Sequence, residues 1–237
     1  MDEHPELNHI GIIMDGNRRF ARRLMLEPWK GHEWGAKKAE DVIDWCAESG
    51  IKAATLYSLS YENFNSRPKQ ELEMLFKLME KEAIRVAGLQ KVHDNKIRFN
   101  VIGRPDMLPK NVQEAFGKLT KATENYKNFT INLAIVYGGR EEIVDAVKRI
   151  AKSAKQGKLD IEKLDESTFG KFLYTNGASD PDLIIRTGGE KRLSGFLLWQ
   201  SAYSEFYFSD KIWPEFEKDD FVLAIDDFKE RKRRFGK

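Results

Sequence analysis

The sequence predicts a single α/β domain with a central, mainly parallel six-stranded sheet flanked by helices. Short apolar runs alternate with amphipathic helical segments over most of the 237 residues. Polar clusters follow residues 14, 58, 136 and 185, each at the end of a predicted strand, and parallel sheets bind ligands at that edge. The pattern has no internal repeat and no Pro/Gly-rich linker, so residues 1–237 are expected to form one domain.

Strands are predicted where short runs rich in apolar residues are bounded by polar residues or glycine. They cover residues 9–14, 52–58, 97–103, 130–136, 183–185 and 205–208. Residues 59–68 mix polar and aromatic side chains and are predicted to form a loop after the second strand.

Helices are predicted between these strands from apolar residues at helical spacing. The first predicted helix begins near Lys30 and ends at Gly50. Further helices are predicted over 69–88, over 110–126, after Gly139 and over 166–174, and a last one runs into the C-terminus. The clearest stripe is on 69–88: Leu72, Leu75, Phe76, Met79, Ala83, Ile84 and Ala87. Such a stripe is either ordinary core packing or the lining of a channel for a long apolar ligand, and periodicity does not separate the two.

The composition is that of a globular protein, with 41% hydrophobic residues and a net charge of +2. A balanced charge gives no reason to expect nucleic-acid binding, so any important electrostatics must be local. The single cysteine, Cys46, lies in an apolar helical pattern and is expected to be buried filler. The N-terminus resembles no signal peptide and no run of 18 apolar residues occurs, so the protein is expected to be cytoplasmic, with peripheral membrane contact through its product or its basic tail left open.

The segment from Pro181 to Phe196 has the composition of an anion site. A buried strand leads into Arg186-Thr187-Gly188-Gly189, and Arg192 and Ser194 follow within eight residues. Glycines let backbone amides approach a ligand, and guanidinium groups bind anionic oxygens through two donors. The alternative is a glycine turn whose arginines are merely solvated.

A second site signal follows the first strand. Asp15 is followed by Gly16, Asn17 and two arginines, which places a hard oxygen ligand for Mg²⁺ beside donors for phosphate. An ordinary Asp-Gly turn before a basic helix would have the same residues. Lys30 and His32, at the start of the next helix, could add donors to a phosphate.

Taken together, these motifs resemble the cis-prenyltransferases, the undecaprenyl diphosphate synthase family. The resemblance covers nearly the whole chain and rests on residues 14–21, 31–32, 60–64, 137–140, 182–199 and 203–208. It implies a homodimeric enzyme with an apolar tunnel that condenses isopentenyl diphosphate onto an allylic diphosphate, with Mg²⁺, to form Z double bonds.

The resemblance also assigns roles to individual residues. Asp15 matches the aspartate that binds Mg²⁺ and diphosphate, Glu205 the second acidic group at the metal, and Asn17 a position next to the chemistry. Arg186, Arg192 and Ser194 match the clamp for isopentenyl diphosphate, and Arg234 and Gly236 match a tail that completes the partner subunit's site. The remaining substrate-binding positions are Gly16, Arg18, Arg19, Phe20, Lys30, His32, Ser60, Glu62, Asn63, Phe64 and Arg67.

The chain departs from the family pattern at several positions. Arg18 replaces a glycine, Phe20 a tryptophan, Gly195 an asparagine, and Ser66 is inserted before Arg67. Pro28 stands where the family has an arginine that helps to hold the allylic diphosphate. This last change leaves irregular coupling of prenyl units open, unless Arg18 or Lys30 substitutes for the missing arginine.

Other functions fit the sequence less well. A trans-prenyltransferase would be all-helical with Asp-Asp-x-x-Asp boxes, and Asp219-Asp220 and Asp226-Asp227 lack the third aspartate. A non-catalytic partner subunit would not need both Asp15 and the arginine clamp. The basic C-terminus could contact nucleic acid or an anionic membrane, although a solvated tail with one substrate contact is the favoured interpretation. Asn17, Asp15 and a substrate phosphate all remain candidates for the proton acceptor.

Overall fold

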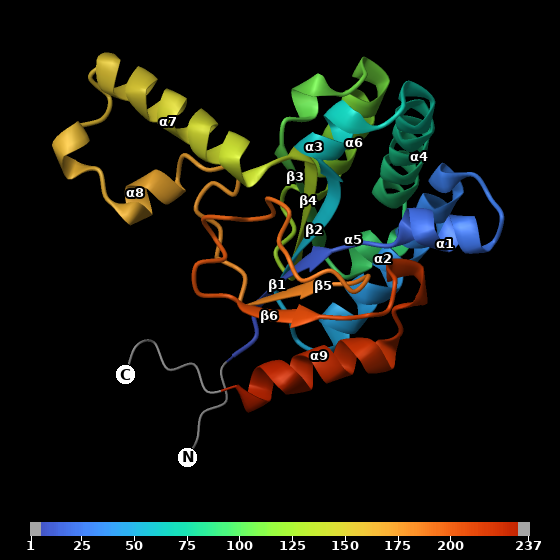
Figure 1. Ribbon diagram of the computed structural model, residues 1–237. Coiled ribbons are helices and arrows are strands. Elements are labelled where there is room, and N and C mark those ends of the chain that lie inside the picture. The colour runs from blue at the N-terminus through green and yellow to red at the C-terminus, as the bar shows by residue number, and fades with distance from the viewer. Residues whose placement is uncertain (1–5, 232–237) are drawn as a thin grey trace.

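The structure is a computed structural model that describes residues 6–231, and its centre is a six-stranded parallel sheet (Figure 1). The strand order is β3-β4-β2-β1-β5-β6, and every pairing is parallel. The strands are β1 (His9–Ile13), β2 (Ala53–Ser60), β3 (Ile97–Gly103), β4 (Phe129–Tyr137), β5 (Leu183–Arg186) and β6 (Glu205–Phe208). The predicted fold class is confirmed, and the sheet is parallel throughout.

Helices alternate with the strands along the chain, as predicted. They are α1 (Asn17–Arg23), α2 (Gly31–Glu48), α3 (Tyr61–Ser66), α4 (Lys69–Ala87), α5 (Gln90–Asp94), α6 (Lys110–Thr123), α7 (Gly139–Lys155), α8 (Glu166–Gly170) and α9 (Lys218–Glu230). Short 3₁₀ turns include η1 (Pro28–Lys30) and η4 (Trp213–Glu215). Among the described residues, no helix has the length and hydropathy that crossing a bilayer requires.

The two faces of the sheet are covered differently. On one face Ile10, Ile12 and Leu183 join side chains of α2, α4, α6 and α9 in the main core, which also buries Cys46, as predicted. On the other face Ile13 and Ile184 join a smaller core with Phe196 and Leu197, which belong to an irregular segment after β5. Neighbouring residues of one strand thus enter opposite cores, as the period of two requires.

The prediction of a loop over 59–68 was wrong. Leu59 and Ser60 complete β2, and α3 follows without a break. The Ser60 side chain accepts a hydrogen bond from the Asn63 amide at 3.0 Å, which is the usual N-cap interaction. The polar composition of this segment therefore reflects a capped helix start and not a loop.

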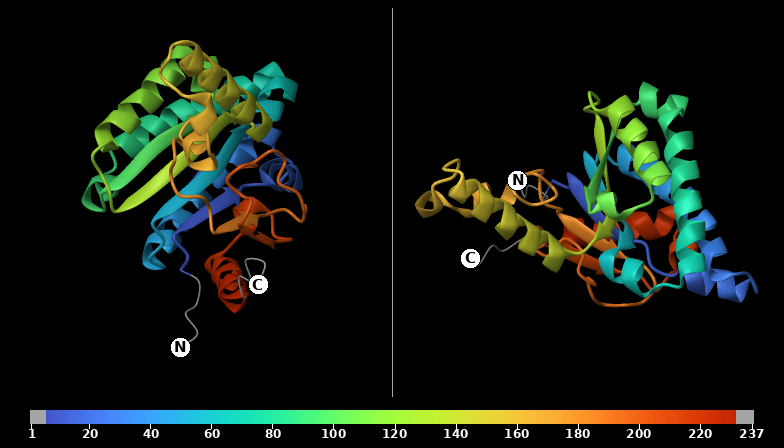
Figure 2. Two further views of the ribbon diagram at one scale, coloured as in Figure 1. Left: turned by 90° about the vertical axis from the view of Figure 1, so that its left-hand side faces the viewer. Right: turned by 90° about the horizontal axis from the view of Figure 1, so that it is seen from above.

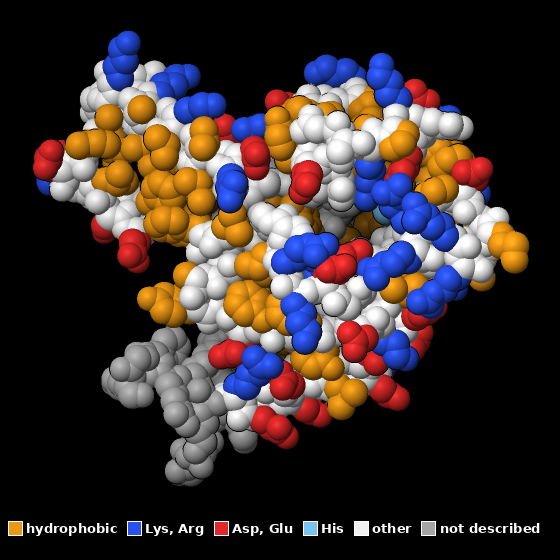
Figure 3. Space-filling view, viewed as in Figure 1, with side chains coloured by type: hydrophobic (Ala, Val, Ile, Leu, Met, Phe, Trp, Pro, Cys, Tyr) orange, Lys and Arg blue, Asp and Glu red, His pale blue; other side chains and the backbone are white. Residues whose placement is uncertain are grey.

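One helix projects from the body of the protein. Figures 1 and 2 show that α7 extends away from the sheet, with α8 beneath its far end. Ile150 is buried, but Val144 and Val147 on the same helix are 50% and 52% exposed. Tyr203 is 78% exposed and Ile161 48% exposed. The orange patch on the left of Figure 3 shows how far apolar side chains gather below α7.

Candidate active site

The predicted anion-binding segments meet at the edge of the sheet where β1, β2 and β5 end. The register places Ile13 beside Arg186, and Ser60 beside Tyr137 of β4. After β1 the chain builds strands on one side of it, then returns to place β5 on its other side. Open parallel sheets bind ligands at such a reversal of strand order. The topology alone therefore brings Asp15 next to Arg186, 171 residues away.

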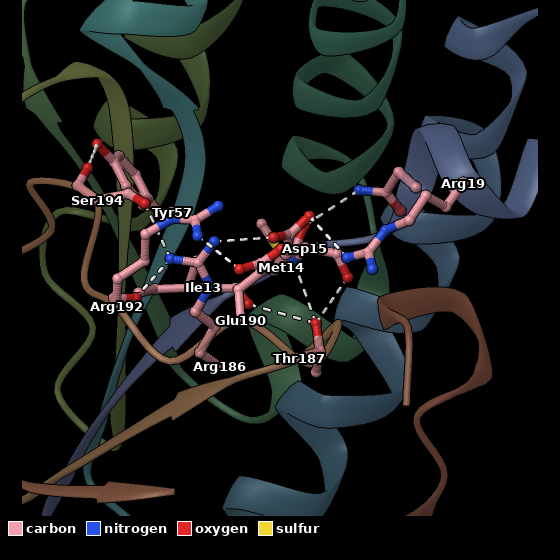
Figure 4. A network of polar contacts seen from close by, with 11 residues as sticks. Ile13, Met14, Asp15, Arg19, Tyr57, Arg186, Thr187, Glu190, Arg192 and Ser194 are labelled. Atoms are coloured by element: carbon pink, nitrogen blue, oxygen red, sulfur yellow. Dashed lines mark hydrogen bonds and ion pairs between the residues drawn. The ribbon is translucent and has the colours of Figure 1, made fainter. Parts of the chain in front are cut away.

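Asp15 lies at the centre of this edge (Figure 4). Its Oδ2 is 2.9 Å from Nη2 of Arg186, and its Oδ1 is 3.4 Å from Nη2 of Arg19. The Thr187 hydroxyl accepts a hydrogen bond from the Asp15 amide at 3.0 Å and donates one to its carbonyl oxygen at 2.9 Å. The Asp15 side chain remains 32% exposed. It is therefore held in place by its backbone yet open to a ligand.

Arg186 organises the segment that follows β5. Its side chain is 4% exposed, and its Nη1 donates to the Ser194 hydroxyl at 2.9 Å and to the Arg192 carbonyl oxygen. Its Nε is buried without a hydrogen-bond partner among the described residues. Arg192 also lines the cavity, and its side chain is 60% exposed and paired to Glu190. The buried Arg186 guanidinium thus fixes the loop, whereas the Arg192 guanidinium lies largely in solvent.

Tyr57 supports the same loop from β2. Its hydroxyl lies 3.1 Å from the Tyr137 carbonyl oxygen and 3.2 Å from the Ser194 carbonyl oxygen. Burial raises the pKa of the Tyr57 phenol above its usual value, so the phenol remains a hydrogen-bond donor at neutral pH.

Two glycines allow the backbone to approach closely here. Gly16 has φ +114°, and a Cβ on it would lie 2.5 Å from Cβ of Ile212. Gly188 has φ +90°, and a Cβ on it would lie 2.3 Å from Nη2 of Arg19. Side chains are strained at such φ values, and at Gly188 any side chain would also push Arg19 away from Asp15.

A second cluster of charges surrounds Glu71, which lies on α4. Its side chain is only 5% exposed, and its Oε1 is 3.2 Å from Nη1 of Arg67 and 3.5 Å from Nε of Arg18. Arg67 Nη1 is also 3.2 Å from Nε2 of His32. The Nε atoms of Arg18 and Arg67 are buried without hydrogen-bond partners among the described residues. A buried carboxylate thus compensates two guanidinium groups whose hydrogen-bonding capacity is not fully used.

His32 is held neutral in this cluster. Burial, and then the positive charges of Arg67 and Arg18, lowers the pKa of His32 to about 3. A neutral imidazole can accept the hydrogen bond from Arg67 through Nε2. His32 therefore orients a cation and adds no charge of its own at neutral pH.

Both clusters open into one cavity of about 660 Å³. At one end it is lined by Asp15, Arg18, Arg19, Arg67 and Arg186. It continues between the sheet and helices α2, α4 and α6, where the lining is apolar: Ile43, Leu56, Leu75, Met79, Ala83, Val92, Phe99, Phe116, Leu119, Leu133 and Ile135. The stripe on α4 therefore does line a cavity with Leu75, Met79 and Ala83, whereas Ile84 is 56% exposed.

Ion pairs between helices form part of the cavity wall. Arg85 of α4 contacts Glu40 of α2, and Lys91 of α5 contacts Asp44 of α2. All four residues line the cavity beside apolar side chains of the same helices. These partly exposed pairs link α2 to α4 and α5 along the cavity wall, although each such pair contributes only about 0–1 kcal/mol.

Most of the predicted site residues line the cavity. They are Asp15, Gly16, Asn17, Arg18, Arg19, His32, Ser60, Glu62, Asn63, Arg67, Arg186, Arg192 and Ser194. Asn17 is nearly buried, and its side-chain amide donates to the Met14 carbonyl oxygen at 3.3 Å.

Three predicted substrate-binding positions within the described residues do not line the cavity. Phe20 packs against Trp34 with ring centroids 5.5 Å apart, Phe64 packs against Phe76, and Lys30 pairs with Glu33 at 2.9 Å. Lys30 does not line the cavity, so it does not stand in for the arginine that Pro28 replaces. Arg234 and Gly236 lie outside the described residues.

The structure does not bring Glu205 to Asp15 within one chain. Glu205 begins β6 and is in register with Leu183, the first residue of β5, whereas Asp15 follows the opposite ends of the strands. Three residues of a strand separate these levels by roughly 10 Å. The Glu205 carboxylate instead pairs with Arg231 at 3.0 Å.

Several residues of the site were not predicted. Glu71, Tyr57, Thr187 and Arg22 all contact the site or line its cavity. Glu71 lies four residues after Arg67, but Arg67 precedes α4, so this spacing alone does not single Glu71 out. Arg22 follows Arg18 by four residues in the same way.

Comparisons with known proteins agree with this geometry. A family model described as "Putative undecaprenyl diphosphate synthase" matches residues 13–236. A tritrans,polycis-undecaprenyl-diphosphate synthase (geranylgeranyl-diphosphate specific) from Methanopyrus kandleri is 54% identical, over 97% of this chain and 84% of that protein. A relative of the same name from Thermoplasma volcanium is 49% identical, over 99% of this chain and 91% of that protein.

A solved structure shows the same fold. The crystal structure of lavandulyl diphosphate synthase from Lavandula x intermedia, in complex with dimethylallyl diphosphate, superposes with a TM-score of 0.90. It is 35% identical and covers 98% of both chains. An all-helical prenyltransferase is excluded by the parallel sheet. With a family model over almost its whole length, close relatives and this fold, the chain belongs to the undecaprenyl diphosphate synthase family of cis-prenyltransferases.

Proposed function

We propose that this chain is a Mg²⁺-dependent prenyltransferase that condenses isopentenyl diphosphate with an allylic prenyl diphosphate and forms a Z double bond. The observation that carries the proposal is the shape of the cavity: an end rich in arginine opens directly onto a long apolar interior. A prenyl diphosphate has the same division between an anionic head and an apolar chain.

The proposed reaction needs both the charged end and the apolar interior of the cavity. The C–O bond of the allylic diphosphate breaks, the double bond of isopentenyl diphosphate supplies the electron pair of the new C–C bond, and a proton leaves. Positive groups around Asp15 stabilise the charge that develops on the departing pyrophosphate. The apolar lining keeps water from the allylic cation. Asn17, Asp15 and a substrate phosphate are the candidates to accept the proton.

Arg186, Arg192 and Ser194 form the proposed half-site for isopentenyl diphosphate. Arg186 is held by Ser194 and Asp15, and its Nε has no hydrogen-bond partner among the described residues, so it keeps a donor for a diphosphate. Arg192 is exposed, and its one ion pair within residues 6–231 is with Glu190, so it can turn toward a diphosphate at little cost.

Arg18, Arg19, Arg67 and His32 form the proposed half-site for the allylic diphosphate, next to Gly16. Arg18 and Arg67 are both paired with Glu71. The arginine that Pro28 replaces could be supplied in function by Arg18 or by Arg22, since both line the cavity.

Asp15 fits a Mg²⁺ ion that is held together with a substrate. Mg²⁺ is commonly bound by one or two carboxylates plus phosphate oxygens and water. Residues 6–231 contain no group of three or more His, Cys, Asp or Glu arranged to hold a metal alone. When bound at Asp15, the ion would neutralise charge on the diphosphate. The proposal rests on Asp15, since Glu205 lies at the other edge of the sheet.

A long product made by regular elongation is the favoured outcome. Relatives at 54% and 49% identity are named undecaprenyl diphosphate synthases specific for geranylgeranyl diphosphate. To test this, the pure protein is incubated with Mg²⁺ or EDTA, labelled isopentenyl diphosphate and each allylic diphosphate from C5 to C20. Products are identified by mass and NMR. Regular chains with Z double bonds support the proposal, an irregular linkage overturns the regiochemistry, and no product with any primer overturns the activity.

We further propose that the protein acts as a homodimer and that Arg234 and Gly236 complete the partner's site. The exposed apolar residues Val144, Val147 and Ile161 support an interface at the α7 arm. The test mixes a variant lacking residues 234–237 with full-length Arg186→Ala, each nearly inactive alone. Activity should return in the mixed dimer, where one site has both an intact Arg186 and an intact tail. Confirmed subunit exchange with only background activity would contradict the proposal.

A further inference from the structure

Three consecutive apolar side chains are exposed at the turn between α1 and η1. Leu24 is 48% exposed, Met25 95% and Leu26 39%. We call Leu24, Met25 and Leu26 the apolar tip. Single exposed apolar residues are common on protein surfaces, but a run of three is unfavourable in water unless it serves a function.

The backbone of the tip forms a hydrogen-bonded turn. The amide of Leu24 bonds to the Ala21 carbonyl oxygen at 3.1 Å, that of Met25 to Arg22 at 3.0 Å, and that of Leu26 to Ala21 at 2.9 Å. Met25 has φ +54°, a conformation that non-glycine residues seldom adopt. The backbone therefore holds the most exposed of the three side chains in an outward position.

The surroundings of the tip are cationic. Residues 18–34 contain five Arg or Lys and two Glu, a net charge of +3 against +2 for the entire chain. Arg22 forms no ion pair with any residue in 6–231, and Arg23 pairs with Glu215 in an exposed position. Figure 3 shows hydrophobic side chains projecting at the right-hand edge of the molecule, with Lys and Arg side chains beside them.

An aromatic pair lies behind the tip. Trp34, at the start of α2, is 41% exposed and packs edge-on against Phe20 of α1. Tryptophan is enriched at the boundary between lipid and water, because its ring is apolar and its N–H is polar. An apolar tip, neighbouring cations and a partly exposed Trp together are typical of a surface that inserts shallowly into a bilayer.

The tip is continuous with the mouth of the cavity. Arg18, Arg19 and Arg22 line the cavity, and Arg22 is two residues from Leu24 on the same helix end. The tip residues themselves are not among those that line it. A surface that contacted the tip would therefore lie next to the opening through which a prenyl diphosphate must pass.

We propose that the apolar tip binds the surface of an anionic lipid bilayer and places the cavity mouth against it. A second copy of the chain is disfavoured as the occupant, because two such surfaces would bring like charges together. The α7 arm, which carries the other exposed apolar surface, lies on the opposite side of the molecule from α1 (Figure 1). Binding to the bilayer does not depend on the proposed prenyl transfer.

The test measures binding to vesicles without any prenyl substrate. The full chain is floated with phosphatidylcholine vesicles and with vesicles that also contain phosphatidylglycerol, at low and high salt. The variant Leu24→Ser/Met25→Ser/Leu26→Ser is compared with Val222→Ser/Leu223→Ser. The latter removes two apolar side chains that are 42% and 57% exposed on α9. Circular dichroism and thermal melting check that both variants fold as the wild type does.

The expected result is salt-sensitive binding of the wild type and the α9 variant to anionic vesicles. The tip variant should bind at least about tenfold more weakly, since three inserted side chains are lost. Equal binding by the tip variant would overturn the proposal. So would equal binding to neutral and anionic vesicles at both salt concentrations. Loss of self-association in the tip variant, without any vesicle binding by the wild type, would assign the tip to a second copy and also overturn it.

Discussion

Glu71→Gln should destabilise the protein when no ligand is added, because Glu71 is the buried counter-charge of Arg67 and Arg18. The substitution keeps the shape of the side chain but leaves Arg67, whose side chain is 12% exposed, without a carboxylate at 3.2 Å. Breaking a buried ion pair from one side costs about 3–5 kcal/mol. Arg18 reaches solvent with a 42% exposed side chain and Arg67 keeps its contact with His32. We therefore expect the low end, about 3 kcal/mol.

Thermal melting gives the size of the effect. For a chain of 237 residues, about 3 kcal/mol corresponds to a fall in Tm of roughly 6–12 °C. Inorganic pyrophosphate should reverse part of this loss, because its charge would replace that of Glu71 beside Arg67 and Arg18. Its dissociation constant should fall by roughly tenfold, which is 1.4 kcal/mol. Both quantities follow from differential scanning fluorimetry over a series of pyrophosphate concentrations without Mg²⁺.

Glu73→Gln is the matched control, since Glu73 is an exposed glutamate two residues away on α4. It should leave both the Tm and the pyrophosphate response unchanged within the error of the assay. If Glu71→Gln melts like this control, the buried ion pair does not stabilise the protein. If it melts lower but binds pyrophosphate as the wild type does, Glu71 supports the fold without competing for the diphosphate site.

Three further predictions concern the site. Asp15→Ala should fold normally but lose nearly all turnover. If the variant keeps more than about a tenth of wild-type activity, a loss of only roughly 1.4 kcal/mol, Asp15 does not bind the metal. Arg186→Lys and Arg192→Lys should each raise the KM for isopentenyl diphosphate more than the KM for the allylic substrate, because the two-pronged guanidinium is lost; equal increases in steady-state assays would show that they do not define that half-site. The pKa of His32 is lowered from 6.5 to about 3, so only the unfolded chain gains its proton between these values and stability should fall as pH falls below about 6.5. Between pH 7 and pH 5, urea unfolding should show about 2 kcal/mol more loss in the wild type than in His32→Gln, and identical losses would mean that His32 is not desolvated.

The sequence predicted the sheet and its functional edge because both depend on local patterns. Each apolar run became a strand, and parallel strands must present their carboxyl ends together. Asp15 and Arg186 could be placed at one site on this ground alone, although 171 residues separate them. The boundaries were less certain, as at Ser60, where one side-chain cap converts an expected loop into a helix start.

Other features depend on packing that no local pattern encodes. Glu71 looks like any glutamate on an amphipathic helix, and only tertiary packing buries it beside Arg18 and Arg67. Val144 belongs to an apolar stripe that predicts burial, yet α7 leaves the body and half of this side chain is exposed. Glu205 was assigned through a resemblance, and the register of β6 places it far from Asp15 in one chain.

The two oxygens of Asp15 face different halves of the site, Oδ1 toward Arg19 and Oδ2 toward Arg186. A diphosphate that draws either arginine away also changes how tightly the carboxylate holds the other. If the two proposed half-sites bind the two diphosphates, occupancy of one alters the affinity of the other, and the coupling free energy is the same whichever substrate binds first. Because both half-sites share the Asp15 side chain, the binding constant of each substrate measured alone does not give its binding constant when the other substrate is bound.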